Sequence, residues 1–263
     1  MQDFSQSPKF VHLRCHSEYS IVDGIVRIND YINAASQDGM PALALTDLSN
    51  LFGAVKFYKA ARKQGIKAII GADVWIENSK KPQQPSRVLL LAQNQSGYHL
   101  LCELLSKAYL VNQKNGRPEL KPEWFNGDTS GLILLSGHAD SDIGFALQQN
   151  NIRLAQKLVT DWSRRFPNRF YLEVQRAASA DNQSRQESLL RQVITIATTL
   201  DIPVVATQPI QFISADDFKA HEARTCIAEG YMLADKRRPR KFSEEQYFKT
   251  QAKMEALFAD MPE

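Results

Sequence analysis

The sequence predicts an α/β protein that folds as a distorted seven-stranded (β/α)7 barrel, similar to a TIM barrel. Short apolar runs alternate with longer amphipathic segments over most of the 263 residues, which is typical of βα units around a parallel sheet. Most of the apolar runs are continuous, as expected where both faces of a strand are covered. A hydrophobic fraction of 43% in a chain of this length supports one large core, and therefore a single domain over residues 1–263.

The predicted strands and helices alternate along the chain. Strands are expected at Phe10–Arg14, Ala42–Asp47, Ala68–Trp75, Arg87–Ala92, Gly131–Ser136, Phe170–Gln175 and Val204–Thr207. Helices are expected at Arg27–Gln37, Phe52–Gln64, Gly97–Leu110, Ile152–Phe166, Gln183–Leu200 and Asp216–Glu229. Because the loops of such a barrel converge at the carboxyl ends of its strands, reactive side chains are expected there.

Three further segments interrupt or follow this alternation. Glu77–Ser86 separates two apolar runs and is expected to form an exposed hairpin tip, and Asn112–Pro118 is expected to be a surface loop. Ser243–Asp260 has a helical pattern, with Ser243 as the expected N-cap.

Composition limits the classes of partner. The net charge is +3 and the charged fraction is 23%, without the strong basic imbalance of a dedicated nucleic-acid-binding domain. Met1–Pro8 lack a secretion signal and no window approaches 18 apolar residues, so we expect a cytoplasmic protein with no membrane partner. Cys15, Cys102 and Cys226 lie far apart without a CxxC pair, so no disulfide is expected.

The densest group of candidate functional residues lies between Val11 and Gly24. His12, Arg14 and His16 alternate along a predicted strand end and would therefore share one face, with Asp23 in the loop beyond. Alternating histidines at a strand end can converge on one metal ion. The same spacing also fits histidines whose nitrogens are satisfied by backbone carbonyls, so both interpretations remain open.

Three more candidates follow predicted strands. Asp47 could be a metal ligand or a general base, although Asp followed by Ser and Asn is also ordinary turn chemistry. A buried Asp73 would need a metal ion or an arginine as its partner. His138 lies just past a strand, where a solvated loop histidine is the alternative.

Other features favour structure over chemistry. Lys236–Lys241, with the sequence KRRPRK, could bind a phosphate backbone, or it could be a solvated loop that pairs with Glu244 and Glu245. His99 is expected on the surface, and His221 near the pocket in a structural role. The aromatic residues at helical spacing, which are expected to pack in the core, are Phe57, Tyr58, Tyr98, Tyr109 and Trp162.

Taken in order, these segments resemble the polymerase and histidinol phosphatase domain, called PHP, in the version that begins the alpha subunit of bacterial DNA polymerase III. The matching runs include FVHLRCHSEYSIVDG, GMPALALTDLSNLFGAVKFYKAARKQGIKAIIGADV, GLILLSG, PVVAT and FKAHEAR. The resemblance covers essentially the whole chain. It implies the PHP fold in an N-terminal fragment of a longer subunit, with residues 231–263 as an exit segment toward the polymerase region.

The resemblance also implies a trinuclear metal site with nine ligand positions, and this sequence departs from it. Five positions cannot bind metal in the family manner: Arg14, Leu48, Ala177, Pro209 and Gln211. Arginine has no lone pair and repels a cation. We therefore expect no metal cluster and no cofactor, but a vestigial pocket in which Arg14 replaces the metals and pairs with Asp23, Asp73 or Asp47. One weakly bound ion is the most that the remaining ligands, His16, Asp23, Asp73 and His138, could hold.

The function that the resemblance implies is a structural and docking role within a magnesium-dependent replicative DNA polymerase, with no catalytic residue in this chain. The implied partners are the proofreading exonuclease subunit, the polymerase region of the same chain and DNA. One alternative is a residual phosphoesterase or pyrophosphatase in which Arg14, His16 and His138 contact phosphate, although it would lack a metal-activated water. A metal-dependent 3′–5′ exonuclease is the other alternative.

Overall fold

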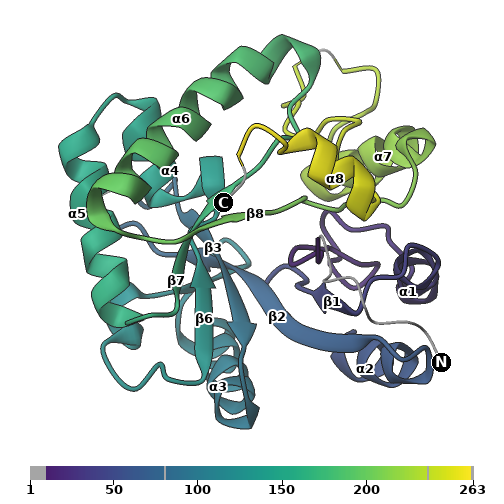
Figure 1. Ribbon diagram of the computed structural model, residues 1–263, viewed down its shortest axis with the longest axis horizontal. Helices are drawn as coiled ribbons and strands as arrows, with labels where there is room; N and C mark the ends of the chain where they lie inside the picture. Colours follow the sequence, from purple (N-terminus) through teal and green to yellow (C-terminus); the bar gives the residue numbers. More distant parts are fainter. Residues whose placement is uncertain (1–9, 80, 236, 262–263) are drawn as a thin grey trace.

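The computed structural model describes residues 10–79, 81–235 and 237–261, and the predicted α/β fold class is confirmed there (Figure 1). The helices are α1 (Ile28–Gln37), α2 (Ala54–Lys63), α3 (Gln95–Val111), α4 (Asp142–Gln148), α5 (Ile152–Arg165), α6 (Gln183–Leu200), α7 (Phe218–Glu229) and α8 (Gln251–Leu257). In Figure 1, α4, α5 and α6 lie on one side of the central strands, and α1, α2, α7 and α8 lie on the other. None of the described helices is long and apolar enough to cross a membrane.

The described residues form an eight-stranded mixed sheet. Its strands are β1 (Ala42–Leu45), β2 (Lys67–Ile76), β3 (Ser86–Ala92), β4 (Gln113–Lys114), β5 (Arg117–Leu120), β6 (Leu132–Leu135), β7 (Phe170–Val174) and β8 (Val204–Ala206). The order is β4-β5-β2-β3-β6-β7-β8, and β1 pairs with the first half of β2.

One strand departs from the expected parallel arrangement. β3 is antiparallel to both β2 and β6, because a loop rather than a crossover helix connects it to β2. This loop is the predicted hairpin tip. The predicted surface loop Asn112–Pro118 instead contains β4 and the start of β5, which pair as a second, short hairpin.

The predicted strand Phe10–Arg14 is wrong, because this segment forms no regular ladder. The carbonyl of His12 accepts a hydrogen bond from the Ala44 N–H of β1 at 2.9 Å, and the His16 N–H donates to Ile210, beyond β8, at 2.9 Å. The segment thus divides its backbone bonds between the two edges of the sheet. It links those edges through isolated bonds rather than as the seventh strand of a regular barrel.

The C-terminal segment folds back over the strand ends. The predicted helix Ser243–Asp260 is shorter than expected: only α8 is helical, and its N-cap is Thr250, whose hydroxyl accepts from the Lys253 N–H at 3.3 Å. The Ser243 hydroxyl instead donates to the carbonyl of Ala177 at 2.5 Å. The Gln211 N–H donates to the Gln246 carbonyl at 2.9 Å, so residues 243–250 cover one edge of the candidate site.

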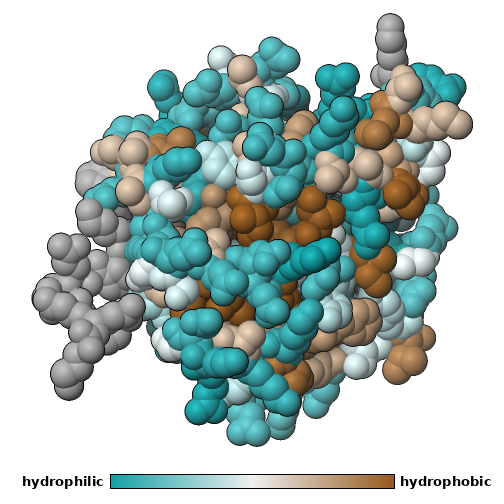
Figure 2. All heavy atoms as spheres, turned by 90° about the vertical axis from the view of Figure 1, so that its right-hand side faces the viewer, coloured by the Kyte–Doolittle hydropathy of each residue, from teal (hydrophilic) through white to brown (hydrophobic). Residues whose placement is uncertain are grey.

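The core has two main parts. One lies between the sheet and α3 to α6 and includes Trp162, and the other packs α1 and α2 against β1 and includes Phe57. Two of the aromatic residues expected in the core, Tyr58 and Tyr109, are instead 46% and 41% exposed. Figure 2, which views the side that carries α1, α2, α7 and α8, shows further hydrophobic side chains at the surface among hydrophilic ones.

Candidate functional site

A buried ion-pair network lies at the carboxyl ends of the strands, and Arg14 is at its centre. Arg14 Nε and Nη2 donate to the two carboxylate oxygens of Glu173, on β7, at 2.8 and 2.9 Å. Its Nη1 donates to Asp73, on β2. Arg14 is 6% exposed and both carboxylates are fully buried. The planar guanidinium therefore joins two strands through charge-assisted hydrogen bonds.

A second arginine completes this network. Arg87, at the start of β3, donates to both carboxylate oxygens of Asp73, and its Nε lies 3.2 Å from Asp73 Oδ1. We call Arg14, Asp73, Arg87 and Glu173 the arginine–carboxylate cluster. Burial by itself would raise the pKa of Asp73, but Arg14 and Arg87 outweigh burial and lower it, so the carboxylate is ionised.

His16 joins the cluster as a cation. Its Nδ1 lies 2.9 Å from Asp23 Oδ1, and its Nε2 lies 3.2 Å from Asp73 Oδ2. Burial disfavours the charged imidazole, but Asp23 and Asp73 outweigh it and raise the pKa of His16 to about 9. A protonated imidazole donates from both nitrogens and offers no lone pair to a metal ion.

Asp47 lies beside the cluster, and its carboxylate accepts two hydrogen bonds from Ser17. One of its carboxylate oxygens accepts the Ser17 N–H at 2.6 Å, and the other accepts the Ser17 hydroxyl at 2.9 Å. Burial raises the pKa of Asp47 to about 6. The turn interpretation therefore describes Asp47 better than the general-base one.

His12 points away from Arg14 and His16, contrary to the predicted shared face. Its Nε2 lies 2.7 Å from the carbonyl of Lys249, and its ring packs against Phe248 with the ring centres 4.8 Å apart. Burial lowers the pKa of His12 to about 4. The alternation expected of a strand fails because the segment is not a regular strand, so His12 matches the backbone-satisfied alternative.

His138 and its neighbour Gly137 both contact Glu173 of the cluster. Its Nδ1 lies 3.3 Å from the Glu173 carbonyl, and the neighbouring Gly137 N–H donates to Glu173 Oε2 at 3.0 Å. His138 is 4% exposed, so the solvated alternative is wrong. Its Nε2 has no hydrogen-bond partner among the described residues, and burial lowers its pKa.

A pocket of about 360 Å³ opens onto the cluster. Cationic side chains outnumber carboxylates on its wall, because Arg14, Arg87, His16 and Lys241 face Asp73 and Asp140. Two of the altered ligand positions, Pro209 and Gln211, also line it. The pocket is therefore better suited to an anion than to a metal ion.

The side chains at the nine implied ligand positions do not fit a trinuclear metal cluster. The Asp73 carboxylate is already paired with Arg14, Arg87 and His16. The ring nitrogens of His16 face Asp23 and Asp73, to which they donate their protons. Leu48 and Ala177 offer no side-chain donor atoms. Within residues 10–79, 81–235 and 237–261, no group of three or more His, Cys, Asp and Glu side chains could hold a metal ion.

The family is decided by comparison with known domains, because residues 12–177 match the family model described as the PHP domain. The chain belongs to the PHP family. This match covers more than half of the chain, and it confirms the family that the sequence motifs indicated.

The relatives of this PHP chain include proteins named DNA polymerase III subunit alpha. The identity is 46% over 258 residues to the protein of Neisseria meningitidis serogroup B, 43% over 254 residues to that of Pseudomonas aeruginosa, and 40% over 256 residues to that of Escherichia coli K12. Each alignment covers 97% of this chain but only 21% or 22% of the relative. The chain thus spans about a fifth of the length of the curated relatives it matches.

One solved structure shares the overall fold of this chain. An amidohydrolase from Chromobacterium violaceum, with bound sulfate and no metal, superimposes with a TM-score of 0.54. The match covers 81% of this chain and 96% of that one, at 14% identity. At this identity the likeness concerns the fold alone.

The basic run 236–241 is largely paired within the PHP domain. Lys236 lies outside the described residues. Arg237 pairs with Asp235 at 2.8 Å, Arg238 with Glu222 at 2.6 Å and Lys241 with Glu229 at 2.6 Å. These acids lie in α7 and the adjoining turn. For Arg237, Arg238 and Lys241, the expected pairing with Glu244 and Glu245 is therefore wrong.

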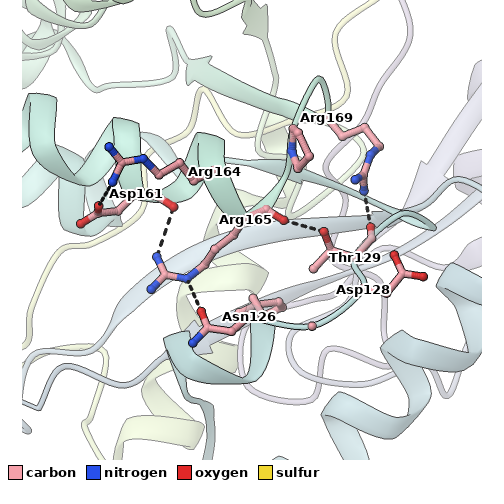
Figure 3. Close-up of a pocket in the computed structure, with 10 residues that line it drawn as sticks. Asn126, Asp128, Thr129, Asp161, Arg164, Arg165 and Arg169 are labelled. Carbon is pink, nitrogen blue, oxygen red and sulfur yellow. Dashed lines mark hydrogen bonds and ion pairs between the residues drawn. The ribbon is translucent and has the colours of Figure 1, made fainter.

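A cleft of about 540 Å³ lies away from the PHP site, at the C-terminal end of α5 (Figure 3). Arg165 Nε donates to the Asn126 side chain at 3.2 Å and its Nη1 to the Asp161 carbonyl at 3.2 Å, while Arg169 donates to the Thr129 carbonyl. Arg164 and Arg165 are in the last turn of α5, where cations interact favourably with the helix dipole. These arginines therefore stabilise a helix end.

Proposed function

We propose that this PHP domain is the N-terminal structural and docking module of a cytoplasmic replicative DNA polymerase III alpha subunit. The observation that carries the proposal is the 40–46% identity, over 97% of this chain, to proteins named DNA polymerase III subunit alpha. In such a protein, magnesium-dependent DNA synthesis takes place outside residues 1–263. The partners are then DNA and the polymerase region of the same chain.

The support for a docking role, as opposed to a catalytic one, is that arginine side chains occupy the place of metal ions at the strand ends. Arg14 and Arg87 neutralise the carboxylates that would otherwise face metal ions, so the PHP site is held together without them. One weakly bound ion, at His16, Asp23, Asp73 and His138, is the most that this proposal allows. Under this proposal a separate proofreading exonuclease subunit carries out nucleolytic editing, and the PHP domain holds that subunit in place.

Elemental analysis of the purified chain, before and after treatment with a chelator, tests the metal-depleted site. We expect well below one equivalent of zinc, manganese or iron, and unchanged binding of the exonuclease subunit in the chelator. Two or more tightly held equivalents, together with nuclease activity that the chelator abolishes, would contradict the proposal and favour the 3′–5′ exonuclease alternative.

A second candidate is a residual phosphoesterase or pyrophosphatase, and the cationic pocket favours it. Arg14, Arg87 and Lys241 line that pocket and match the charge of a phosphate or pyrophosphate. His16 and His138 would act with Arg14 as phosphate contacts under this alternative. Calorimetric titration with pyrophosphate, combined with an assay for released phosphate, separates binding from hydrolysis; binding without turnover leaves the docking role in place.

A further inference from the structure

The C-terminal segment completes the cationic pocket, and we call residues 241–261 the strap. Lys241, Phe242 and Gln246 of the strap line this pocket of about 360 Å³, together with side chains of the arginine–carboxylate cluster. One wall of the pocket therefore belongs to a segment that lies far from the others in the sequence. The pocket has this form only while the strap is docked.

The strap joins the two sides of a gap in the sheet. Within the described residues, the ladder of β1 is with β2 and the ladder of β8 is with β7, so no ladder joins β1 to β8. On the side of β8, the Phe248 N–H donates to the Phe212 carbonyl at 3.1 Å. On the side of β1, the Gln251 N–H donates to the Asp38 carboxylate at 2.8 Å. The strap thus depends on both sides for its backbone hydrogen bonds.

An arginine outside the pocket fastens the end of the strap. Arg176, in the loop after β7, donates to the Leu257 carbonyl at 2.6 Å. It also pairs with Asp260 at 2.5 Å and with Glu187 of α6 at 2.8 Å. Arg176 is not among the residues that line the pocket, so it can hold the strap without contacting a bound molecule.

Gln211 connects the strap to the buried charges. Its backbone N–H donates to the Gln246 carbonyl at 2.9 Å, and its side-chain amide lies 3.4 Å from His16 Nδ1. Gln211 lines the pocket and is 4% exposed, and its Oε1 has no hydrogen-bond partner among the described residues. A shift of the strap therefore moves a residue that also contacts the pocket and the cluster.

The strap also brings a cation to the pocket. Three other cations on the wall, Arg14, His16 and Arg87, are already paired with buried carboxylates. Lys241 is paired at the surface instead: its Nζ lies 2.6 Å from Glu229 Oε1, and its side chain is 60% exposed. Because a surface ion pair contributes little, Lys241 can exchange Glu229 for an anion in the pocket at small cost.

We propose that docking of the strap is coupled to binding of a phosphate-bearing anion in the pocket. The anion binds when the strap is docked, and its binding in turn stabilises the docked strap, because such coupling is reciprocal. Under the proposed function the strap leads toward the polymerase region, so occupancy of the pocket is transmitted to that region. This inference rests on the second candidate function for anion binding, and not for hydrolysis.

Hydrogen exchange of the full chain, with and without inorganic pyrophosphate, tests the coupling. At ten times the dissociation constant, pyrophosphate should slow exchange of the Gln211 and Phe248 N–H groups about tenfold, as expected when only the docked state binds. The β4–β5 hairpin, at the other end of the strand order from β8, is the internal control and should exchange at the same rate. Unchanged exchange of both amides at saturating pyrophosphate would overturn the coupling and leave the anion site in place.

Two substitutions separate the cation from the fastening. Lys241→Gln should weaken pyrophosphate binding about fivefold or more, whereas Arg240→Gln, at an exposed neighbour that does not line the pocket, should change it less than about twofold. Arg176→Ala should speed exchange of the Phe248 N–H about tenfold or more without pyrophosphate. Its matched control is Arg164→Ala, at a side chain of α5 that is 75% exposed.

The remaining outcomes distinguish the strap from the proposed function. No pyrophosphate binding by the unsubstituted chain would contradict both the coupling and the second candidate function, but not the docking role. Pyrophosphate binding that Lys241→Gln leaves unchanged would contradict the contribution of the strap alone. So would exchange of Phe248 that is equally slow in Arg176→Ala and Arg164→Ala.

Discussion

The arginine–carboxylate cluster differs from an apolar groove, lined by residues 49–52 and the C-terminal half of α3, in the degree to which the polar groups are satisfied. In the cluster, Asp73 and Glu173 are fully buried and every carboxylate oxygen has a charged or polar partner. In the groove, the Ser49 hydroxyl has no partner among the described residues, and Phe52 and Leu110 face water.

The difference follows from the free-energy cost of leaving each kind of group without a partner: a buried carboxylate in the cluster and an exposed apolar side chain in the groove. A buried carboxylate without a partner would cost several kcal/mol, so a folded chain that has lost metal ligands must supply a cation of its own. Exposed apolar surface costs far less and can remain until a partner covers it. The cluster is thus complete within the chain, whereas the groove leaves apolar surface in contact with water.

Replacing Arg14 with alanine should cause the largest loss in the free energy of unfolding. The substitution leaves Asp73 with Arg87 and His16 and deprives Glu173 of its bidentate partner, and loss of one partner of a buried ion pair costs about 3–5 kcal/mol. Urea unfolding should record that loss. Arg237→Ala, at a side chain that is 87% exposed, is the control and should leave the transition unchanged. An unaltered midpoint for Arg14→Ala would mean that the cluster does not stabilise the fold.

Much of the fold could be predicted from the sequence because apolar periodicity is local. Helices such as α5 and α6 lie within one or two residues of the predicted ranges. The failures occurred where local pattern is weak: α4 has only seven residues, and β4 and β5 form a short hairpin around Gly116. Residues 10–14 are apolar enough to suggest a strand, but tertiary contacts on both sides prevent a regular ladder.

The candidate site was only partly predictable, because ion pairs form between residues distant in the sequence. The pairing of Arg14 with Asp73 was among the expected alternatives. Glu173 was missed, although a glutamate inside the apolar run FYLEV was a signal that it needed a buried partner. It contacts Arg14 from 159 positions away, and neither spacing nor periodicity specifies such a contact.

Alkaline pH should weaken the cluster through His16. Its pKa rises from 6.5 to about 9 on folding, so its stabilisation is fully present below pH 6.5 and is lost as the pH rises through 9. This shift corresponds to about 3 kcal/mol. Urea titrations between pH 6.5 and 9.5 should therefore show falling stability, and His16→Gln should remove most of the slope. An equal slope in the variant would assign the pH dependence to other groups.

Thr207→Val sharpens the comparison by removing one donor from the cluster. The Thr207 hydroxyl donates to Glu173 Oε1, and a hydrogen bond to a buried charge contributes about 1.5–3 kcal/mol. We expect a loss near the lower end, because Arg14 and the Gln175 amide still donate to Glu173. Thr199→Val on the exposed face of α6 is the matched control and should shift unfolding by less than about 0.5 kcal/mol.

Leu110→Ser should have the smallest effect on stability, although it lies in the second of the two compared regions. Leu110 is 82% exposed, so serine removes little buried apolar area, and the free energy of unfolding should change by less than about 0.5 kcal/mol. Calorimetric unfolding of the isolated chain measures this change. A loss of several kcal/mol would mean that Leu110 packs within the fold and that the groove is part of the core. Near-neutral stability would separate this surface, which the fold does not require, from the cluster, which the fold itself requires.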